Sequence, residues 1–439
     1  MPFISESSLE LREAEKTWYP VWASRTHKAR PIPLEPPVTN AMPFFILCIK
    51  LRKLIFAEKQ NFGKDVFMTT GRPINLLTME YPPMRGGAGV YCEELVHAAE
   101  KAGHLVRVLG PTRITGAENT KIIKIPIKGS QDWTCSWKAW RFLKNQSFAN
   151  EALHIAEPGA LRAMIRFGWL LPMPKILIIT LHGSEIPKFS RSPIEAIFFR
   201  KLLRRAHKIH VLSKHNEERL VRFCPKTKPA IILAPGAPAR KVLPYADSQT
   251  KINYSKKKLI LLCVGRIHPR KGQLELLQAV KALSDEKKAN LTCWFAGPST
   301  HKKYAKKLKE MSCSVGPKVE FLGDLSDEEL RETYQQADIF ALSSVPKSNS
   351  VEGFGFVYLE ASAHGLPILA HRTGGVENAV LDGKTGLFAD PKNSNDLVEK
   401  LEQLLSKPGL RETLGESGRK WAAQHDWQKT ADLLYEPAA

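Results

Sequence analysis

The chain has 439 residues, of which 43% are hydrophobic, a balance typical of a folded protein that is long enough for two domains. Its seven cysteines are scattered and include no Cys-x-x-Cys pair, so a disulfide framework and a structural zinc site are not expected. No apolar run approaches the roughly 20 residues of a membrane-spanning helix, and the polar, acidic first residues do not resemble a secretory signal peptide. We therefore expect a cytoplasmic protein in a reducing environment.

The net charge of +21 is unevenly distributed. Residues 68–250 carry +15, whereas residues 1–67 and residues 251–439 carry +3 each. An excess concentrated in one part of the chain predicts an anionic partner for that part, such as nucleic acid, an anionic membrane surface or an acidic acceptor. A merely solvated basic surface is the alternative interpretation.

The N-terminal segment, residues 1–70, differs from the rest of the chain. Residues 29–43 are rich in proline, and residues 44–59 are apolar with Lys50, Arg52 and Lys53 interleaved. The second segment could be an amphipathic helix on a membrane, a tail packed on the body, or sequence upstream of a true start at Met68. We interpret residues 1–70 as a dispensable extension, either disordered or upstream of the start.

From residue 74 onward, apolar strands alternate with helical patterns in two runs separated by a polar linker at residues 240–258. The predicted strands are residues 74–79, 105–110, 121–126, 152–156, 176–181, 208–213 and 230–234, and then 259–265, 291–297, 318–323, 338–343, 367–370 and 386–389. Near-continuous apolar strands between helices indicate parallel sheets covered on both faces. The sequence thus predicts two doubly wound α/β domains, with ligands at the carboxyl ends of the strands in the cleft between them.

Two segments of the first run are candidate ligand contacts. The loop at residues 85–91 is not a dinucleotide fingerprint, since Cys92 occupies the third glycine position, but Gly86 and Gly87 could let a phosphate or sugar approach closely. A tight turn that needs glycine only for its geometry is the alternative. His182 directly follows the strand at residues 176–181, where it could contact a sugar hydroxyl or the leaving phosphate, and a structural histidine is the alternative.

Residues 194–208 form a basic and apolar helix. Its cations are Arg200, Lys201, Arg204 and Arg205, and its apolar residues are Ile197, Phe198, Phe199, Leu202 and Leu203. It could dock on anionic lipid, but we favour a crossover helix with one face in the core and a basic outer face. Trp133, Trp137 and Trp140 add aromatic character nearby in the sequence.

The first strand of the second run ends in GRIHPRKG, which places Arg266 and Lys271 five residues apart across a turn before a helix. The planar fork of an arginine and the compact charge of a lysine could together neutralise a diphosphate. Two solvated cations on a surface turn are the alternative.

The stretch EGFGFVYLE places Glu352 in a glycine-broken loop and Glu360 a turn into the following helix. Backbone amides of such a loop can approach a phosphate, and an ionised carboxylate can accept hydrogen bonds from two vicinal hydroxyls. The unit therefore suits a ligand that contains both phosphate and sugar. We expect no metal, because the sequence has no HExxH motif, no Cys/His cluster and no Asp-x-Asp motif.

Taken in chain order, these motifs resemble those of the retaining glycosyltransferases of family 4. Members of that family have the GT-B fold, in which two Rossmann-like domains face each other across a cleft. The resemblance covers residues 73–432. It rests on the GGAG loop, His182 with Gly183, GRxxxxKG at residues 265–272, VEFLG at residues 319–323, the two-glutamate unit, and Gly374 and Gly375 with Glu377.

The resemblance implies a role for each motif residue. Arg266 and Lys271 would bind the donor diphosphate, Glu360 the ribose hydroxyls and Glu352 the hydroxyls of the transferred sugar. The amides of the loop would hold sugar and phosphate, the first glycine loop would lie against the diphosphate, and His182 would contact the donor sugar. The expected catalytic residues are thus Arg266, Lys271, Glu352 and His182, and the expected donor-binding residues are Gly86, Gly87, Gly353, Phe354, Gly355, Phe356 and Glu360.

The resemblance also implies the activity. It is the metal-independent transfer of a hexosyl unit, with retention of configuration and no cofactor, from a UDP-, GDP- or ADP-linked sugar to a lipid-linked, polysaccharide or other glycan acceptor. Residues 71–245 would bind the acceptor, residues 255–418 the nucleotide sugar, and a helix within residues 419–439 would cross back to the first domain. We expect no nucleic-acid partner, and we expect peripheral binding to the inner face of the plasma membrane if an anionic surface is the partner.

Two departures and two alternatives stay open. The segment at residues 234–238 reads APGAP instead of the usual Pro-Asn-Gly-Val-Asp, and the loop between Ser344 and Glu352 is longer than the commonest form. The long loop resembles the subgroup that transfers mannose to lipid acceptors. The alternatives are a sugar-nucleotide epimerase or hydrolase of GT-B architecture, which can lack the two-glutamate unit, and a non-catalytic module that binds anions.

Overall fold

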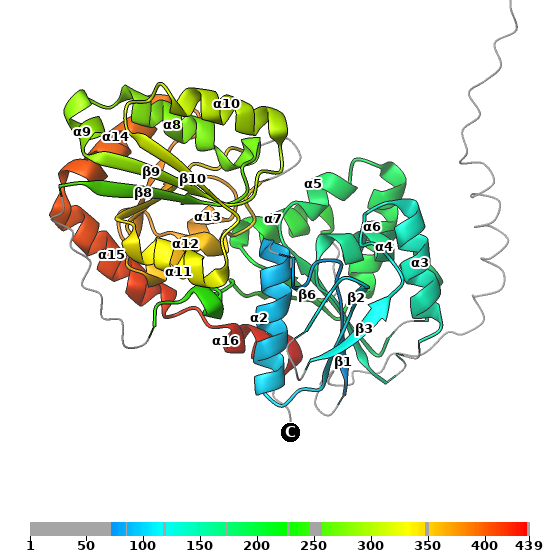
Figure 1. The fold of residues 1–439 in the computed structure, drawn as a ribbon. Helices are drawn as coiled ribbons and strands as arrows, with labels where there is room; N and C mark the ends of the chain where they lie inside the picture. Colours follow the sequence, from blue (N-terminus) through cyan, green and yellow to red (C-terminus); the bar gives the residue numbers. More distant parts are fainter. Residues whose placement is uncertain are drawn as a thin grey trace, which may run out of the picture. The chain divides into compact units, whose positions relative to one another are not determined.

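The computed structural model describes residues 72–436 except residues 85, 117–119, 147, 149, 173, 226–228, 246–256 and 347–350. The described residues all belong to one compact unit of the chain and form two parallel sheets with helices on their faces (Figure 1). The predictions for residues 1–70, for residue 85, for most of the linker and for part of the long loop before Glu352 lie outside the described residues.

The first sheet has seven strands in the order β3-β2-β1-β4-β5-β6-β7, and every pair is parallel. Its strands are β1 (Ile74–Leu77), β2 (Val106–Pro111), β3 (Lys121–Ile125), β4 (Ala152–Ile155), β5 (Ile176–Leu181), β6 (Lys208–Val211) and β7 (Ala230–Leu233). The strands β1, β4 and β5 are buried along their whole length, as expected for a sheet with helices on both faces.

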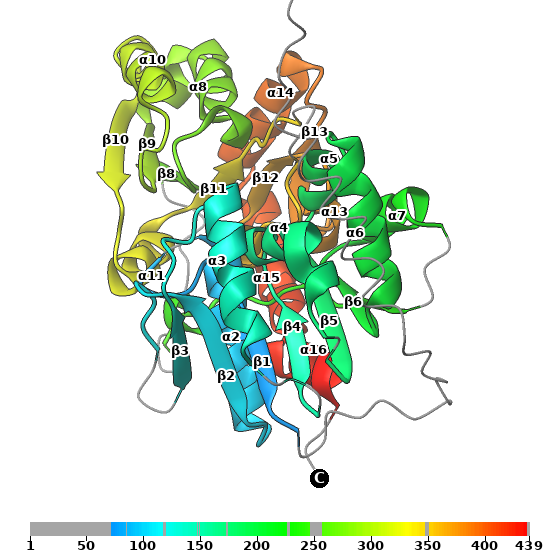
Figure 2. The same ribbon diagram turned by 90° about the vertical axis from the view of Figure 1, so that its right-hand side faces the viewer.

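The helices of this part alternate with the strands and cover the sheet (Figure 2). They are α2 (Gly87–Lys101), α3 (Trp133–Lys144), α4 (Pro158–Phe167), η1 (Gly168–Leu170), α5 (Glu185–Phe189), α6 (Pro193–Arg205), α7 (Lys214–Phe223) and η2 (Arg240–Val242). Several begin at a side chain that caps free backbone amides, such as Asp132 before α3 and Ser213 before α7. The helix α6 buries Phe199, Leu202 and Leu203 and exposes Lys201, which is the crossover arrangement that we favoured.

The second sheet has six parallel strands in the order β10-β9-β8-β11-β12-β13. They are β8 (Leu259–Val264), β9 (Leu291–Ala296), β10 (Lys318–Gly323), β11 (Ile339–Leu342), β12 (Ile368–His371) and β13 (Gly386–Ala389). Their helices are η3 (Pro269–Lys271), α8 (Gln273–Ala282), α9 (Asp285–Ala289), α10 (Lys302–Ser312), α11 (Asp327–Gln336), α12 (Phe356–Ala363), α13 (Val376–Ala379), α14 (Ser394–Ser406), α15 (Pro408–Ala422) and α16 (Trp427–Tyr435). The two parallel sheets confirm the predicted α/β fold class.

The strand order of each sheet determines where a ligand can bind. It reverses between β1 and β4 in the first sheet and between β8 and β11 in the second. At such a switch point the two flanking loops diverge and leave a crevice beyond the carboxyl ends of the strands. The loops after β1, β5, β8 and β11 carry Gly86 and Gly87, His182, Lys271 and Glu352, respectively.

The last helix, α16, packs on α2 and so connects the end of the chain to the first sheet. The indole Nε1 of Trp427 donates to the carbonyl oxygen of Pro238 at 3.0 Å, and the Lys208 Nζ donates to the carbonyl oxygens of Leu433 and Leu434. The hydroxyl of Tyr435 lies 2.6 Å from His154 Nδ1 on β4. None of the helices in the described ranges is both long and apolar enough to span a membrane.

Candidate active site

Glu352 lies at the centre of a cluster of charges at the carboxyl edge of the second sheet. Its Oε2 atom accepts from Lys271 Nζ at 2.9 Å, from Arg270 Nη1 at 2.6 Å and from the hydroxyl of Ser344 at 3.1 Å. Only 10% of the Glu352 side chain is exposed, and 11% of that of Lys271. The β8 and β11 loops thus bring together two cations and one carboxylate that are distant in the sequence.

The electrostatics of this cluster favour the charged forms of both partners. Burial by itself raises the pKa of Glu352, but the charges of Lys271 and Arg270 outweigh it and hold that pKa below the ordinary value. Burial lowers the pKa of Lys271, and the carboxylate of Glu352 offsets part of that effect. Because two cations share one carboxylate, the cluster carries an excess positive charge that suits a phosphate.

Arg266 is not part of the ion pair. It follows β8 and is exposed, and its carbonyl oxygen accepts from Gln273 Nε2 at 3.0 Å. Its charge nevertheless helps to lower the pKa of Lys271. The structure therefore places Lys271 against Glu352 and leaves Arg266 exposed after the end of β8.

The loop after Glu352 contacts the end of β5 very closely. A Cβ atom built on Gly353 would lie 1.6 Å from the carbonyl oxygen of His182, so only glycine fits there without movement of the backbone. The amide of Asn216 also lies near this loop, with Nδ2 at 3.4 Å from the carbonyl oxygen of Gly353. The end of β5 and the two-glutamate unit are thus neighbours, although they belong to different sheets and lie far apart in the sequence.

His182 is oriented by contacts on both sides of its ring. Its Nε2 lies 2.8 Å from the carbonyl oxygen of Ala156, and its ring meets the ring of Tyr91 edge-on at 4.8 Å. Because a carbonyl oxygen can only accept, Nε2 carries the proton and Nδ1 remains an acceptor in the neutral ring. The carboxylate of Glu185 accepts from the backbone N–H groups of His182 and Gly183, which fixes this strand end.

Glu360 is buried and is bound by the hydroxyl of Tyr334, which donates to its Oε2 at 2.9 Å. Burial raises the pKa of this carboxyl group to about 7, although hydrogen bonds from Tyr334 and from the backbone of Ala239 oppose the shift. Glu360 therefore changes its charge near neutral pH, unlike Glu352.

The first glycine loop meets the same region. A Cβ atom built on Gly87, the first residue of α2, would lie 3.9 Å from the ring of Phe356, and one on Gly86 would lie 3.0 Å from Oε2 of Glu80. Phe356 begins α12 and packs against Phe354 at 5.7 Å. The predicted residues thus form two neighbouring pairs. Gly87 faces the ring of Phe356, and Gly353 packs against the backbone of His182.

Three residues near the site were not predicted from the sequence. They are Arg270, which binds Glu352, Ser344, which donates to it, and Asn216, which contacts the loop. Arg270 stands directly before Lys271, so its sequence position was the available signal. Nothing in the local sequence distinguishes Ser344 or Asn216 from other polar residues at strand ends.

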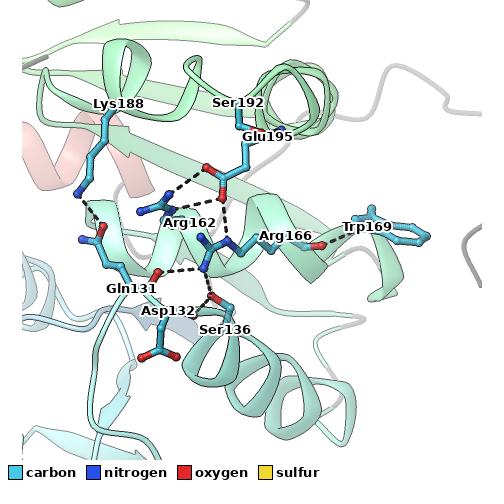
Figure 3. A network of polar contacts seen from close by, with 9 residues as sticks. All are labelled: Gln131, Asp132, Ser136, Arg162, Arg166, Trp169, Lys188, Ser192 and Glu195. Atoms are coloured by element: carbon cyan, nitrogen blue, oxygen red, sulfur yellow. Dashed lines mark hydrogen bonds and ion pairs between the residues drawn. The ribbon is translucent and has the colours of Figure 1, made fainter. Parts of the chain in front are cut away.

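A second polar network holds the helices on one face of the first sheet together (Figure 3). The carboxylate of Glu195 on α6 binds Arg162 and Arg166 on α4, and Arg166 also donates to the carbonyl oxygen of Gln131 and the hydroxyl of Ser136. Lys188 donates to the side chain of Gln131 at 2.7 Å. These contacts fix α3, α4, α5 and α6 to one another. All four helices lie within residues 68–250, which carry most of the excess positive charge.

Two family models match consecutive parts of the chain. Residues 85–235 match the model described as Glycosyltransferase Family 4, and residues 246–421 match the model described as Glycosyl transferases group 1. Together they include the first glycine loop, the end of β5 and the two-glutamate unit.

Individual proteins agree with these matches. The chain is 26% identical over 383 residues to the GDP-mannose-dependent alpha-(1-6)-phosphatidylinositol monomannoside mannosyltransferase of Mycolicibacterium smegmatis, a match that covers 80% of this chain and 94% of that protein. It is 35% identical over 219 residues to the D-inositol 3-phosphate glycosyltransferase of Corynebacterium urealyticum, a match that covers 47% of this chain and 50% of that protein.

Solved structures agree on the fold. Sucrose-phosphate synthase from Thermosynechococcus elongatus superposes with a TM-score of 0.67 at 21% identity, over 82% of this chain and 96% of that one. At this identity the likeness concerns the fold alone. Together with the family models, it leads to the conclusion that the chain belongs to the family 4 glycosyltransferases of GT-B fold and is an enzyme that uses a nucleotide sugar.

Proposed function

We propose that the enzyme transfers a hexosyl unit from a nucleoside-diphosphate sugar to a lipid-linked or other glycan acceptor, with retention of anomeric configuration and without a metal ion. The observation that carries this proposal is the cluster of Lys271, Arg270 and Glu352 beside the contact of Gly353 with His182. This cluster combines a carboxylate for sugar hydroxyls with cations for a diphosphate at the carboxyl edge of the second sheet.

The chemistry follows from where charge develops. When the bond between the anomeric carbon and the phosphate oxygen breaks, negative charge grows on the departing diphosphate. Lys271 and Arg266, fixed beside the end of β8, stabilise that charge more in the transition state than in the ground state. The leaving phosphate takes the proton of the acceptor hydroxyl, which attacks from the same face, so no covalent enzyme intermediate is needed and configuration is retained.

Each remaining predicted residue has a task in this reaction. Glu352 accepts from hydroxyls of the transferred sugar, and the Nδ1 atom of His182 accepts from another hydroxyl of that sugar. Glu360 accepts from the ribose hydroxyls once it is ionised. Gly87 lets α2 approach the diphosphate, and the amides after Gly353 donate to it.

GDP-mannose is the first donor to test. The mycobacterial relative is named as GDP-mannose-dependent. The long loop before Glu352 also resembles that of the subgroup that transfers mannose to lipid acceptors. UDP- and ADP-linked hexoses are the next donors, because the fold accommodates different bases.

An anionic membrane surface is the partner that we propose for the basic part of the chain, residues 68–250. On α3, Trp133 is 52% exposed and Trp137 is also exposed, with the guanidinium of Arg141 5.5 Å from the Trp137 ring. On α6, the exposed Ile197 is one turn before the exposed Lys201. The network around Glu195 holds α3, α4 and α6 together (Figure 3). Indole rings beside cations favour the lipid–water interface.

Donor turnover tests the enzymatic part of the proposal. Release of nucleoside diphosphate from GDP-mannose, UDP-glucose and ADP-glucose is measured with a lipid acceptor extract, with and without EDTA. We expect one donor to be used in both conditions. Rapid epimer formation without acceptor would favour an epimerase, and absence of turnover with salt-sensitive anion binding would favour a non-catalytic module.

Vesicle co-sedimentation tests the membrane part. We expect binding to rise with the content of anionic lipid, to fall with salt, and to weaken for Trp137→Ser and Ile197→Ser. The control is Leu105→Ser, because Leu105 is 57% exposed but precedes β2, away from α3 and α6 in the chain. Equal binding by all variants, insensitive to salt, would contradict the membrane interface.

A further inference from the structure

A cavity of about 510 Å³ borders both chain segments that connect the two sheets. One wall is formed by residues 237–244, which lead from β7 into the linker, and another is formed by Ala423, Trp427 and their neighbours between α15 and α16. The third wall is the last part of α2, with His97 and Lys101. We call this space the hinge cavity. Its volume is that of a typical small-molecule site, and none of the predicted donor-binding residues lines it.

The charges of the hinge cavity favour an anion. Lys101, Arg240 and Arg419 contribute cationic groups from three different segments. The carboxylate of Glu94 is already bound, because Arg240 approaches it with Nε at 3.3 Å and with its backbone N–H at 3.2 Å. The other carboxylate, Asp426, caps α16 by accepting from a backbone amide at 2.9 Å.

Two cations in the cavity are thus available to a ligand. In the part of the chain that the structure describes, no carboxylate forms an ion pair with Lys101 or Arg419. Lys101 belongs to α2 and Arg419 to α15, so the two cations line the cavity from different helices. Two positive charges that line one cavity suit a phosphate monoester, which carries nearly two negative charges at neutral pH.

The rest of the lining is apolar. Ala98, Pro238, Leu243, Pro244 and Ala422 supply hydrocarbon surface between the charged groups. An apolar wall next to cations is complementary to an organic phosphate with a hydrocarbon or aromatic body, and less so to a free inorganic ion.

The hinge cavity contacts the predicted donor site through aromatic rings. Trp427, which lines the cavity, packs on Phe356 with ring centroids 5.5 Å apart and donates to the carbonyl oxygen of Pro238, just before the linker. His425, which also lines the cavity, lies 6.3 Å from Phe354 between ring centroids. A Cβ atom on Gly236 would lie 1.8 Å from the same Phe356 ring. The start of α12 is therefore packed between the two connecting segments.

The two sites are nevertheless separate. Gly87 at the first turn of α2 faces Phe356, whereas His97 is ten residues further along the same helix, or about 15 Å at 1.5 Å per residue. A phosphate at Lys101 cannot be the diphosphate of a donor that lies against Gly87.

We propose that the hinge cavity is an effector site for a small organic phosphate, and that its occupancy changes the affinity of the enzyme for its donor. A ligand held by Lys101 and Arg419 contacts α2 and α15, which belong to the two different sheets. If domain closure moves these helices relative to each other, the effector binds one state more tightly than the other. The coupling is then reciprocal, so the donor changes the affinity for the effector by the same factor.

Phenyl phosphate, a phosphate monoester with an aromatic body, is the probe. Calorimetric titration of the full chain is done alone and with saturating UDP, GDP or ADP, whichever binds. We expect one saturable site that persists when nucleotide is bound, at least tenfold weaker binding in Lys101→Ala and Arg419→Ala, and unchanged binding in Lys420→Ala. Lys420 is the matched control, since it is exposed on α15 but does not line the cavity.

Three results would overturn the proposal. They are the absence of saturable binding up to 10 mM (roughly the weak end of metabolite affinities), full competition by the nucleotide, and equal loss of binding in Lys420→Ala. The regulatory part requires in addition that phenyl phosphate changes the nucleotide Kd at least twofold in the wild type and not in Lys101→Ala. Because phenyl phosphate binding is measured without donor or turnover, its result is independent of whether the proposed transfer reaction is correct.

Discussion

Lys271 and Glu352 form an ion pair in which Nζ lies 2.9 Å from Oε2, and the side chains are only 11% and 10% exposed. The same carboxylate oxygen also accepts from Arg270. This pairing joins the loop after β8 to the loop after β11, and it places one carboxylate between two cations.

Lys271→Ala and Arg266→Ala should each lower turnover at least tenfold, because removal of one group that stabilises developing charge costs a few kcal/mol, about 2.7–4 in a well-studied case. Steady-state release of nucleoside diphosphate measures the effect. Lys281→Ala is the control, since Lys281 is exposed in the last turn of α8. Near-normal transfer by both site variants would rule out the assigned roles.

Glu352→Ala should destabilise the protein as well as inactivate it. The change leaves Lys271 and Arg270 buried without their carboxylate, which typically costs about 3–5 kcal/mol. The denaturation midpoint measures this loss, and Glu377→Ala is the control, because its ion pair with Arg372 is about half exposed and is worth about 1 kcal/mol or less. Similar midpoints for the two variants would show that the buried cluster does not depend on Glu352.

Acid should weaken the Glu352 cluster in a defined direction. Its pKa is held below the ordinary value of 4.5, so the stabilisation is fully present above pH 4.5 and is lost as the pH falls through the lowered pKa. Between pH 5 and 9 we expect no change of activity from the titration of Glu352. The denaturation midpoints of wild type and Glu352→Gln are compared across this pH range. A difference between the two midpoints that changes with pH would contradict the lowered pKa of Glu352.

Donor affinity should depend on pH through Glu360. Burial raises its pKa to about 7, so the free protein loses stability as the pH rises from 4.5 to about 7 and the carboxylate ionises. In the role that we propose, the ionised group accepts from ribose hydroxyls, so donor affinity should rise over the upper part of this range. Glu360→Gln should bind more weakly at pH 8 and show a flat profile. A 2′-deoxy nucleotide is the control, and an identical pH profile for it would exclude a ribose contact.

Gly353→Ala should disrupt the contact with the end of β5, because the added Cβ would lie 1.6 Å from the carbonyl oxygen of His182. We expect the KM for the donor to rise at least tenfold while the protein remains folded. Gly409→Ala is the control, because no atom lies within 4 Å of a Cβ built there. Unchanged kinetics in Gly353→Ala would mean that the close approach is not needed for donor binding.

The sequence predicted the elements better than their contacts. Residues 176–181 were correctly predicted as a strand, because a continuous apolar run at the centre of a parallel sheet has no polar interruption. The strand predicted at residues 367–370 runs instead from Ile368 to His371, since Pro367 has no N–H to donate to the ladder. The strands β1 and β6 end two residues earlier than predicted, at Leu77 and Val211.

The contacts at the site depend on sheet order, which local sequence does not reveal. Arg270 meets Glu352 because β8 and β11 are neighbours, and Gly353 meets His182 because both lie at strand ends of different sheets. Motifs predicted which residues approach a donor, but they contained no information on the partner of Glu352 or on the hinge cavity. Those features arise from the packing of segments that are distant from one another in the sequence.

Proton NMR of the sugar-transfer product tests the central claim most directly. The wild-type enzyme is incubated with GDP-mannose and a lipid acceptor in the presence of EDTA, and the anomeric signal of the first product is compared with that of the donor. The proposed reaction predicts a product with the donor's anomeric configuration, formed by the wild type and at least tenfold more slowly by Lys271→Ala. An inverted product, or equal rates for the two proteins, would contradict it.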